Sequence, residues 1–203
     1  MKIWKSLSKG FGQLLFQLLP VAIGVYIGIL AGNWNDARHE KANQEQFLKT
    51  LSLELEENRK MVKRSAEYHQ LLGDQIDSIR QVASQEEMEL PVLGSGSFGS
   101  FINGWRGIMI PSTERSIYET GIIANALVGL DFATINRISK VYNLQEGYRK
   151  YSEPILERLL NMDMHTTRQE AVLILSFITT DLNEMEFNLV RNYEQLMEFL
   201  ADR

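Results

Sequence analysis

The chain has 203 residues, contains no cysteine and carries a formal net charge of −5. This length allows one membrane segment and one domain of ordinary size, and the lack of cysteine excludes disulfides and thiolate chemistry. The first 35 residues hold three lysines and no acid, whereas the rest holds 18 basic and 26 acidic residues. Nucleic-acid affinity depends largely on neutralising phosphates, so the acidic part argues against a nucleic-acid partner.

Residues 10–35 predict a transmembrane helix. This stretch follows a basic leader, residues 1–9, and contains no charged side chain. Its apolar run, residues 14–32, has the length of about 20 residues that a helix needs to cross the hydrocarbon core. A cleaved signal peptide is one alternative, and a buried core helix is a weaker one, because nothing else in the chain is apolar enough to surround such a segment. The length of the run and the Asn-Trp-Asn-Asp sequence after it favour an uncleaved anchor in the lipid bilayer.

Side chains typical of a membrane interface flank this run. The rings of Trp4 and Trp34 are expected at the two headgroup zones, and Arg38 follows the helix exit. Basic residues on the two sides of the run nearly balance, so the positive-inside rule gives only a weak preference for one orientation. The short basic leader favours a cytoplasmic N-terminus with the domain outside the cytoplasm.

Three glycines, Gly24, Gly28 and Gly32, recur at four-residue spacing within the run. On a helix they form one smooth stripe along which a second backbone can approach closely. The stripe predicts a contact face for a second copy of the chain or for a membrane-protein partner. The alternative is that glycine is simply common in membrane helices.

The segment from residue 36 to about residue 84 predicts one long amphipathic helix. It contains no proline and a single glycine, and apolar residues recur at alternating spacings of three and four. The apolar series is Leu48, Leu51, Leu55, Val62, Leu72, Ile76, Ile79 and Ala83. Asn58, Ser65 and His69 occupy the same series, so they fix a register, face a groove between helices or lie at the edge of a bundle interface.

Residues 85–111 interrupt the helical pattern with glycine, serine and proline and form an irregular connection. The connection also carries many apolar side chains, which argues against plain disorder. One interpretation is a loop that folds back to cap the core of a bundle. The other is a partner or ligand surface, for which Phe98, Phe101 and Trp105 are the candidates.

A helix is predicted to begin at residues 112–115, a capping-box-like sequence, and to stop near Gly121. A short apolar turn, residues 122–130, follows it.

Asp131 is expected to cap a second long helix that runs to about Leu159. After a turn at 163–168, residues 168–180 and 181–201 read as two helical stretches or as one continuous helix. The fold class is therefore all-α, with one N-terminal transmembrane helix that continues into an antiparallel helical bundle.

Residues 23–41 resemble the membrane-exit signature of a widespread, uncharacterised bacterial family of single-pass membrane proteins. The pattern is Asn-Trp-Asn-acid-x-Arg, carried here by Asn33, Trp34, Asn35, Asp36 and Arg38. Residues 116–121 and 135–151 are similar to further elements of that family, and the Gly/Ser-rich loop around 92–110 departs from it. The resemblance implies a one-span anchor in a bacterial inner membrane and a helical domain over residues 36–203, and it brings no known activity or cofactor.

The sequence shows no catalytic or cofactor-binding constellation. The three histidines, His39, His69 and His165, lack metal-ligand spacing to one another. Asp163 and His165 form a pair that suits a solvent-facing turn or a helix cap better than a metal site. His69 is most simply a hydrogen-bonded residue of the bundle, and a pH response is a further hypothesis for it if it is buried. We expect neither catalysis nor a cofactor.

Two functions remain in competition at this level. The first is a membrane-anchored, non-catalytic interaction module whose helical domain binds a protein partner at or near the membrane. The alternative is an extracytoplasmic, ligand-sensing bundle that acts through a partner.

Overall fold

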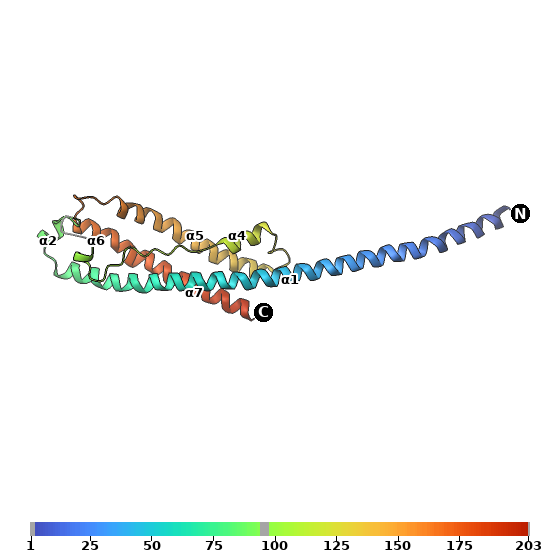
Figure 1. The fold of residues 1–203 in the computed structure, drawn as a ribbon, viewed down its shortest axis with the longest axis horizontal. Helices are drawn as coiled ribbons and strands as arrows, with labels where there is room; N and C mark the ends of the chain where they lie inside the picture. The colour runs from blue at the N-terminus through green and yellow to red at the C-terminus, as the bar shows by residue number, and fades with distance from the viewer. Residues whose placement is uncertain (1–2, 94–97, 203) are drawn as a thin grey trace. The chain divides into compact units, whose positions relative to one another are not determined.

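The computed structural model describes the backbone of residues 3–93 and 98–202 and, within these ranges, the side chains from residue 23 onward (Figure 1). The described chain is helical apart from its connections and one isolated β-bridge between Pro91 and Thr167. The prediction of an all-α fold is confirmed. The chain divides into two compact units, residues 1–46 and 47–203.

The first unit consists of the N-terminal part of helix α1 (Ile3–Val82). Among the residues whose side chains are described, no helix is both long enough and apolar enough to cross a bilayer. The predicted transmembrane segment, residues 10–35, lies partly outside those residues, because side chains 1–22 are not described. Trp4 lies outside them as well. The membrane helix therefore stays a prediction.

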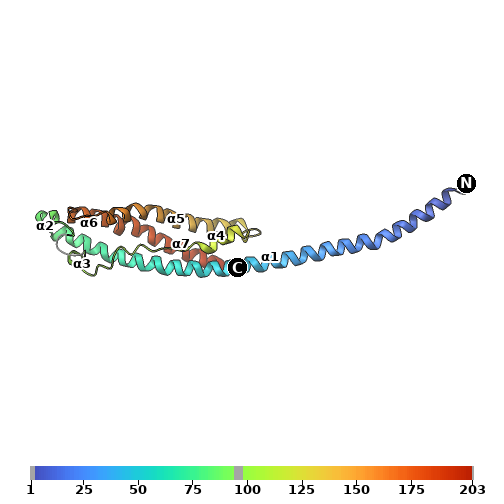
Figure 2. The same cartoon turned by 45° about the horizontal axis from the view of Figure 1, so that its top comes forward.

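The second unit is a bundle of long helices accompanied by shorter ones (Figures 1 and 2). After the remainder of α1 come, in chain order, α2 (Gln85–Glu89), α3 (Phe98–Phe101), α4 (Ser116–Ile123), α5 (Phe132–Leu160), α6 (Arg168–Phe177), η1 (Ile178–Leu182) and α7 (Asn183–Ala201). Helix α5 packs against α6, η1 and α7. The π-helical turn η1 joins α6 to α7 without a break, so the last two predicted stretches form one continuous helix.

The bundle is only partly antiparallel. Helices α1 and α5 run in the same direction, and α7 runs opposite to both (Figure 2). Side-chain contacts agree: Glu54 on α1 meets Tyr142 on α5, while Ser65 and Tyr148, further along the same two helices, meet the same Glu186. A parallel pair requires the chain to return along the length of the domain, and a non-helical segment makes this return.

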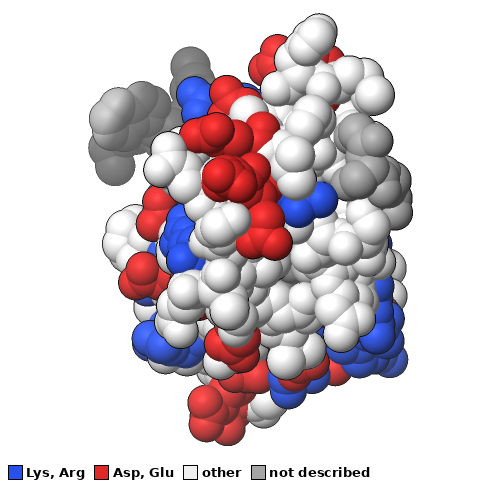
Figure 3. All heavy atoms as spheres, turned by 90° about the vertical axis from the view of Figure 1, so that its left-hand side faces the viewer, with Lys and Arg blue, Asp and Glu red and all other residues white. Residues whose placement is uncertain are grey.

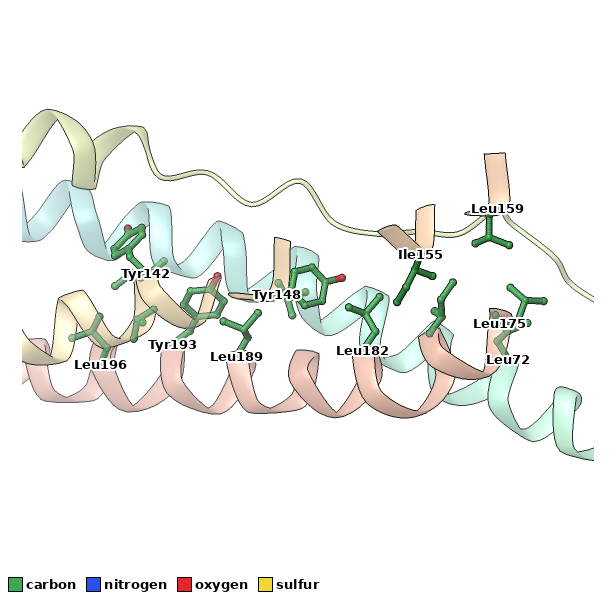
Figure 4. Packing of buried hydrophobic residues seen from close by; sticks show 14 of the residues in the cluster. Leu72, Tyr142, Tyr148, Ile155, Leu159, Leu175, Leu182, Leu189, Tyr193 and Leu196 are labelled. Carbon is green, nitrogen blue, oxygen red and sulfur yellow. The ribbon is translucent and has the colours of Figure 1, made fainter. Parts of the chain in front are cut away.

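The core confirms the periodicity of the long helix. Leu51, Leu55, Val62, Leu72 and Ile76 are buried, with at most 2% of their surface exposed. They face apolar and tyrosine side chains from α5, α6, η1 and α7 (Figure 4). The facing side chains that Figure 4 labels are Tyr142, Tyr148, Ile155, Leu159, Leu175, Leu182, Leu189, Tyr193 and Leu196.

Helix starts follow the expected capping chemistry with one exception. Asp131 caps α5 as predicted, because its carboxylate accepts the Thr134 N–H at 3.0 Å. Thr167 and Glu170 form a capping box at the start of α6. The predicted helix start at 112–115 is wrong: those residues have no regular secondary structure, and α4 begins at Ser116.

Helix α4 continues through Gly121, which was predicted to end it. This glycine is buried against the ring of Phe47, and a methyl group at position 121 would overlap that ring. Close packing against Phe47, and not the end of a helix, therefore explains why position 121 holds glycine. A methyl group added to Gly147 on α5 would, in contrast, have no atom within 4 Å.

Replacing Gly121 with alanine should lower the free energy of unfolding by about 1–3 kcal/mol, because the added methyl group overpacks the contact with Phe47. Chemical denaturation of the full chain in detergent measures this. The matched Gly147→Ala variant, also mid-helix, should gain up to about 1 kcal/mol from helix propensity. Equal effects of the two substitutions would refute the close approach at Gly121.

Candidate functional site

The connection from residue 105 to residue 115, called the strap below, has no regular secondary structure and lies along α1 (Figure 1). Its backbone is held by polar side chains of the α1 seam. The Asn58 amide donates to the Glu114 carbonyl oxygen at 2.6 Å and accepts the Glu114 N–H at 2.7 Å. Gln145 on α5 donates to the same carbonyl oxygen at 2.9 Å. The Asn58 side-chain amide thus supplies the hydrogen bonds that a neighbouring strand would otherwise give this backbone.

Two turns further along α1, Ser65 and His69 hold the middle of the strap. The Ser65 hydroxyl lies 2.6 Å from the carbonyl oxygen of Met109, and Nε2 of His69 lies 2.6 Å from the carbonyl oxygen of Ile108. Both side chains are at most 1% exposed. The polar members of the predicted seam therefore bind a neighbouring backbone, and His69 is a hydrogen-bonded bundle residue as expected.

Tyr68 holds the beginning of the strap from the same helix. Its hydroxyl donates to the Gly107 carbonyl oxygen at 3.0 Å and accepts the Arg106 N–H at 3.1 Å. Gly107 and Met109 both have positive φ, +87° and +50°. This conformation is strained for methionine, and the hydrogen bonds from α1 compensate for that strain.

Glu186 on α7 is the hub beneath the strap. One carboxylate oxygen accepts the Tyr148 hydroxyl at 2.8 Å and lies 2.7 Å from the Ser65 hydroxyl, and the other lies 2.9 Å from Nδ1 of His69. Asn183, the first residue after the π-helical turn, donates to Glu186 at 3.3 Å and to the Ala66 carbonyl oxygen at 2.8 Å. Glu186 and His69 are both fully buried. The hub joins α1, α5 and α7 through one carboxylate.

Both ring nitrogens of His69 face oxygen atoms. The Ile108 carbonyl oxygen can only accept, so Nε2 carries a proton. One further proton must then lie between Nδ1 and the Glu186 carboxylate.

The Ser65, His69 and Glu186 side chains do not form a catalytic triad. A triad needs the hydroxyl on one ring nitrogen and the carboxylate on the other. Here both Ser65 and Glu186 face Nδ1, at 3.5 and 2.9 Å, and Nε2 is taken by a backbone carbonyl oxygen. All three residues are buried from solvent, so the cluster has a structural role.

A second buried carboxylate, that of Glu54 on α1, caps the first turn of α4. It accepts the Ile117 N–H at 2.7 Å and the Ser116 hydroxyl at 3.3 Å, in the first turn of the helix. The Tyr142 hydroxyl donates to its other oxygen at 2.5 Å. Helix α4 has no side-chain cap from its own N-cap residue, Arg115. Glu54 therefore supplies from α1 the acceptor that a local cap would provide.

The three candidate partner residues of the loop pack inward. The rings of Phe98 and Trp105 are stacked with centroids 4.8 Å apart, and the guanidinium carbon of Arg168 lies 5.1 Å from the centroid of Phe101. All three aromatic side chains are half-buried against the hydrophobic core. This placement favours the loop that folds back over the bundle, and partner binding by this loop stays a prediction.

The predicted membrane-face residues make few contacts within the chain. Nothing lies within 4 Å of a Cβ placed on Gly24, Gly28 or Gly32. The guanidinium carbon of Arg38 lies 5.1 Å from the ring centroid of Trp34, which is 67% exposed. Association through the glycine stripe stays a prediction.

Sequence reasoning did not assign a role to the apolar turn at 122–130. Together with Phe132 at the start of α5, this turn forms an exposed tip at one end of the bundle. Ile123 and Phe132 are 83% and 82% exposed, and Ile122 and Val128 are about half exposed. No charged residue occurs between Glu119 and Asp131, and this gap in charge is the signal that the sequence offered. The opposite end differs: acidic side chains gather over the end that bears α2 (Figure 3).

The Asp163 carboxylate accepts the backbone N–H groups of His165 and Thr166 at 2.8 and 3.1 Å, which makes it a turn residue. Among the described residues, no group of three His, Asp or Glu side chains is arranged to hold a metal ion.

Comparisons of the chain with family models, curated proteins and solved structures gave no significant match. The resemblance to the bacterial membrane family stays a prediction.

Removing one buried hydroxyl of the hub should destabilise the domain. Tyr148→Phe leaves Glu186 without one donor and should cost roughly 1–3 kcal/mol of unfolding free energy. Tyr151→Phe removes an exposed hydrogen bond to Asp181 and should change stability by less than about 0.5 kcal/mol. Equal losses in urea titrations of the two variants would contradict the role of the hub.

Alkaline pH should weaken the fold through the buried tyrosines. Burial, together with Glu186, raises the pKa of Tyr148, and burial with Glu54 raises the pKa of Tyr142. Above pH 10 the unfolded tyrosines release protons that the folded state keeps, so stability falls as pH rises. Tyr148→Phe should reduce this loss by up to about 1.4 kcal/mol per pH unit. Parallel profiles of the wild type and this variant between pH 9.5 and 11 would disprove the assignment.

Proposed function

We propose that the protein is a membrane-anchored, non-catalytic interaction module whose helical domain binds a protein partner at or near the membrane. The observation that carries the proposal is apolar surface without cover. The large apolar side chains of the first unit between Ile23 and Leu30 are about half exposed or more, and the remaining side of α1 there carries Gly24 and Gly28. A helix that is apolar all round requires an apolar environment, and a bilayer supplies one.

The interior of the domain supports a non-catalytic role. Two carboxylates are buried in it. Glu54 accepts hydrogen bonds from the start of α4 and from Tyr142, and Glu186 accepts one from Tyr148 and lies 2.9 Å from Nδ1 of His69. A catalytic acid or base needs access to a substrate. Both carboxylates are committed to holding the strap, α4 and the helices in place.

The exposed tip supports a protein contact. Contiguous exposed apolar residues are typical of interaction sites, and Ile123 and Phe132 are the most exposed large apolar side chains of the tip. We therefore assign the tip to a membrane-protein partner or a second copy of the chain.

The alternative, a ligand-sensing bundle, is favoured by one further observation. A hollow of about 380 Å³ lies between α1 and the residues around the start of the strap. Its volume falls in the ordinary range of about 300–1,000 Å³ for small-molecule sites.

The anchor is tested by placing charge in the apolar run. Ile23→Arg combined with Ile27→Arg should release most of the chain from membranes washed with alkaline carbonate, since each arginine costs about 2.5–3.5 kcal/mol in a bilayer. Leu160→Arg with Leu173→Arg, two exposed positions of the domain, is the control and should leave the chain in the membrane. A wild-type chain that the wash removes would refute the anchor.

The partner contact is tested with a photo-crosslinking residue at Ile123 or Phe132 in intact membranes. We expect one discrete adduct, whose mass distinguishes a second copy from another protein. The same residue at Leu160, 73% exposed but far from the tip in the sequence, is the control and should give none. A crosslinker at Trp105 tests the loop surface. The absence of an adduct at both tip positions would reject the tip as the contact.

A further inference from the structure

The hollow between α1 and the residues around the start of the strap has two cationic walls. Arg64 from α1 and Arg106 from the strap both line it. Within the described residues, neither guanidinium group has a hydrogen-bond or ion-pair partner. The domain that bears them is strongly acidic overall, so two unpaired arginines on one hollow need an explanation.

One acid, Glu67, also lines the hollow, and its carboxylate lies 4.0 Å from the Lys63 ammonium group outside it. Two guanidinium groups and one carboxylate leave the lining with a net charge of +1. A planar guanidinium group matches a carboxylate through paired hydrogen bonds. The lining therefore suits a singly charged carboxylate better than a doubly charged phosphate.

The rest of the lining includes apolar side chains. Leu71 is 63% exposed and Met109 is 37% exposed, while Leu72 beside them is buried. An apolar chain lying on Leu71 and Met109 would remove their surface from water, which is favourable by about 25 cal/mol per Å². The lining of the hollow thus combines two cationic side chains with apolar surface.

The strap side of the hollow is held in place before any ligand arrives. Gly104, Gly107 and Met109 have positive φ, and the backbone between them is bonded to Tyr68 and Ser65. A rigid wall lowers the entropy that binding must overcome. The Tyr68 hydroxyl is already occupied by this backbone, so recognition depends on the two arginines.

We propose that this hollow binds a small carboxylate with a short apolar chain, the carboxylate between Arg64 and Arg106 and the chain on Leu71 and Met109. The proposal does not depend on the membrane anchor. It supplies a ligand class for the domain, and it places that ligand against the strap that the buried hub holds.

The test is calorimetric titration of the full chain in detergent with hexanoate. We expect saturable binding by the wild type and at least tenfold weaker binding for Arg64→Gln and for Arg106→Gln, since each removes charge-assisted hydrogen bonds. Arg158→Gln, an exposed arginine outside the hollow, is the matched control and should bind as the wild type does. Glu67→Gln should bind more tightly, because it removes the only acid of the lining.

Two further probes separate the parts of the ligand. Acetate lacks the chain, and hexylamine has the chain with the opposite charge, so both should bind at least tenfold more weakly than hexanoate. Both arginines are exposed, and their variants should unfold at the wild-type temperature, which excludes misfolding as a cause. Equal hexanoate binding by the wild type and Arg64→Gln, or no saturable binding by the wild type, would overturn the proposal.

Discussion

The fold depends on how the backbone of one non-helical segment is satisfied inside a helical domain. Buried N–H and C=O groups must find partners, and the strap has no neighbouring strand to provide them. Asn58, Ser65 and His69 of α1 supply those partners at 2.6–2.7 Å. The buried face of α1 therefore carries polar side chains where it faces the strap, and it is apolar before and after that stretch.

This constraint explains the topology and the buried charges. Because the strap returns the chain along α1, α5 can run parallel to α1, and α7 closes the bundle in the opposite direction (Figure 1). Glu186 then bonds the side chains of α1 that hold the strap to Tyr148 of α5. The π-helical turn before α7 places Asn183 beside Glu186 and Ala66. Replacing any one member leaves another buried polar group unpaired, which is costly at low dielectric.

Periodicity was enough to predict the long helix and most of its apolar positions, of which Leu48, Ile79 and Ala83 are only half-buried. The Asp131 cap was also predictable, because capping depends on local sequence. Periodicity also identified Asn58, Ser65 and His69 as members of the seam. Their partners could not be predicted, since Glu114, Met109 and Ile108 contribute only backbone atoms and any residue would supply the same groups. The start of α4 was misplaced for a related reason: its cap, Glu54, comes from a distant part of the sequence.

The exposed surfaces are separate from the interior polar groups that hold the strap. The contacts proposed for other molecules lie at the apolar tip, at the hollow beside Arg64 and Arg106, and on the first unit. The strap forms one wall of the hollow, so a ligand there would touch the segment on which the bundle depends.

Amide hydrogen exchange of Glu114, followed by NMR in the full chain, tests whether α1 side chains hold the strap. We expect this N–H to be protected in the wild type, because it donates to Asn58 at 2.7 Å. Asn58→Leu should accelerate its exchange at least tenfold while core amides of α5 stay protected. Rapid exchange of the Glu114 amide in the wild type, or an exchange rate that Asn58→Leu leaves unchanged, would show that the strap does not depend on α1.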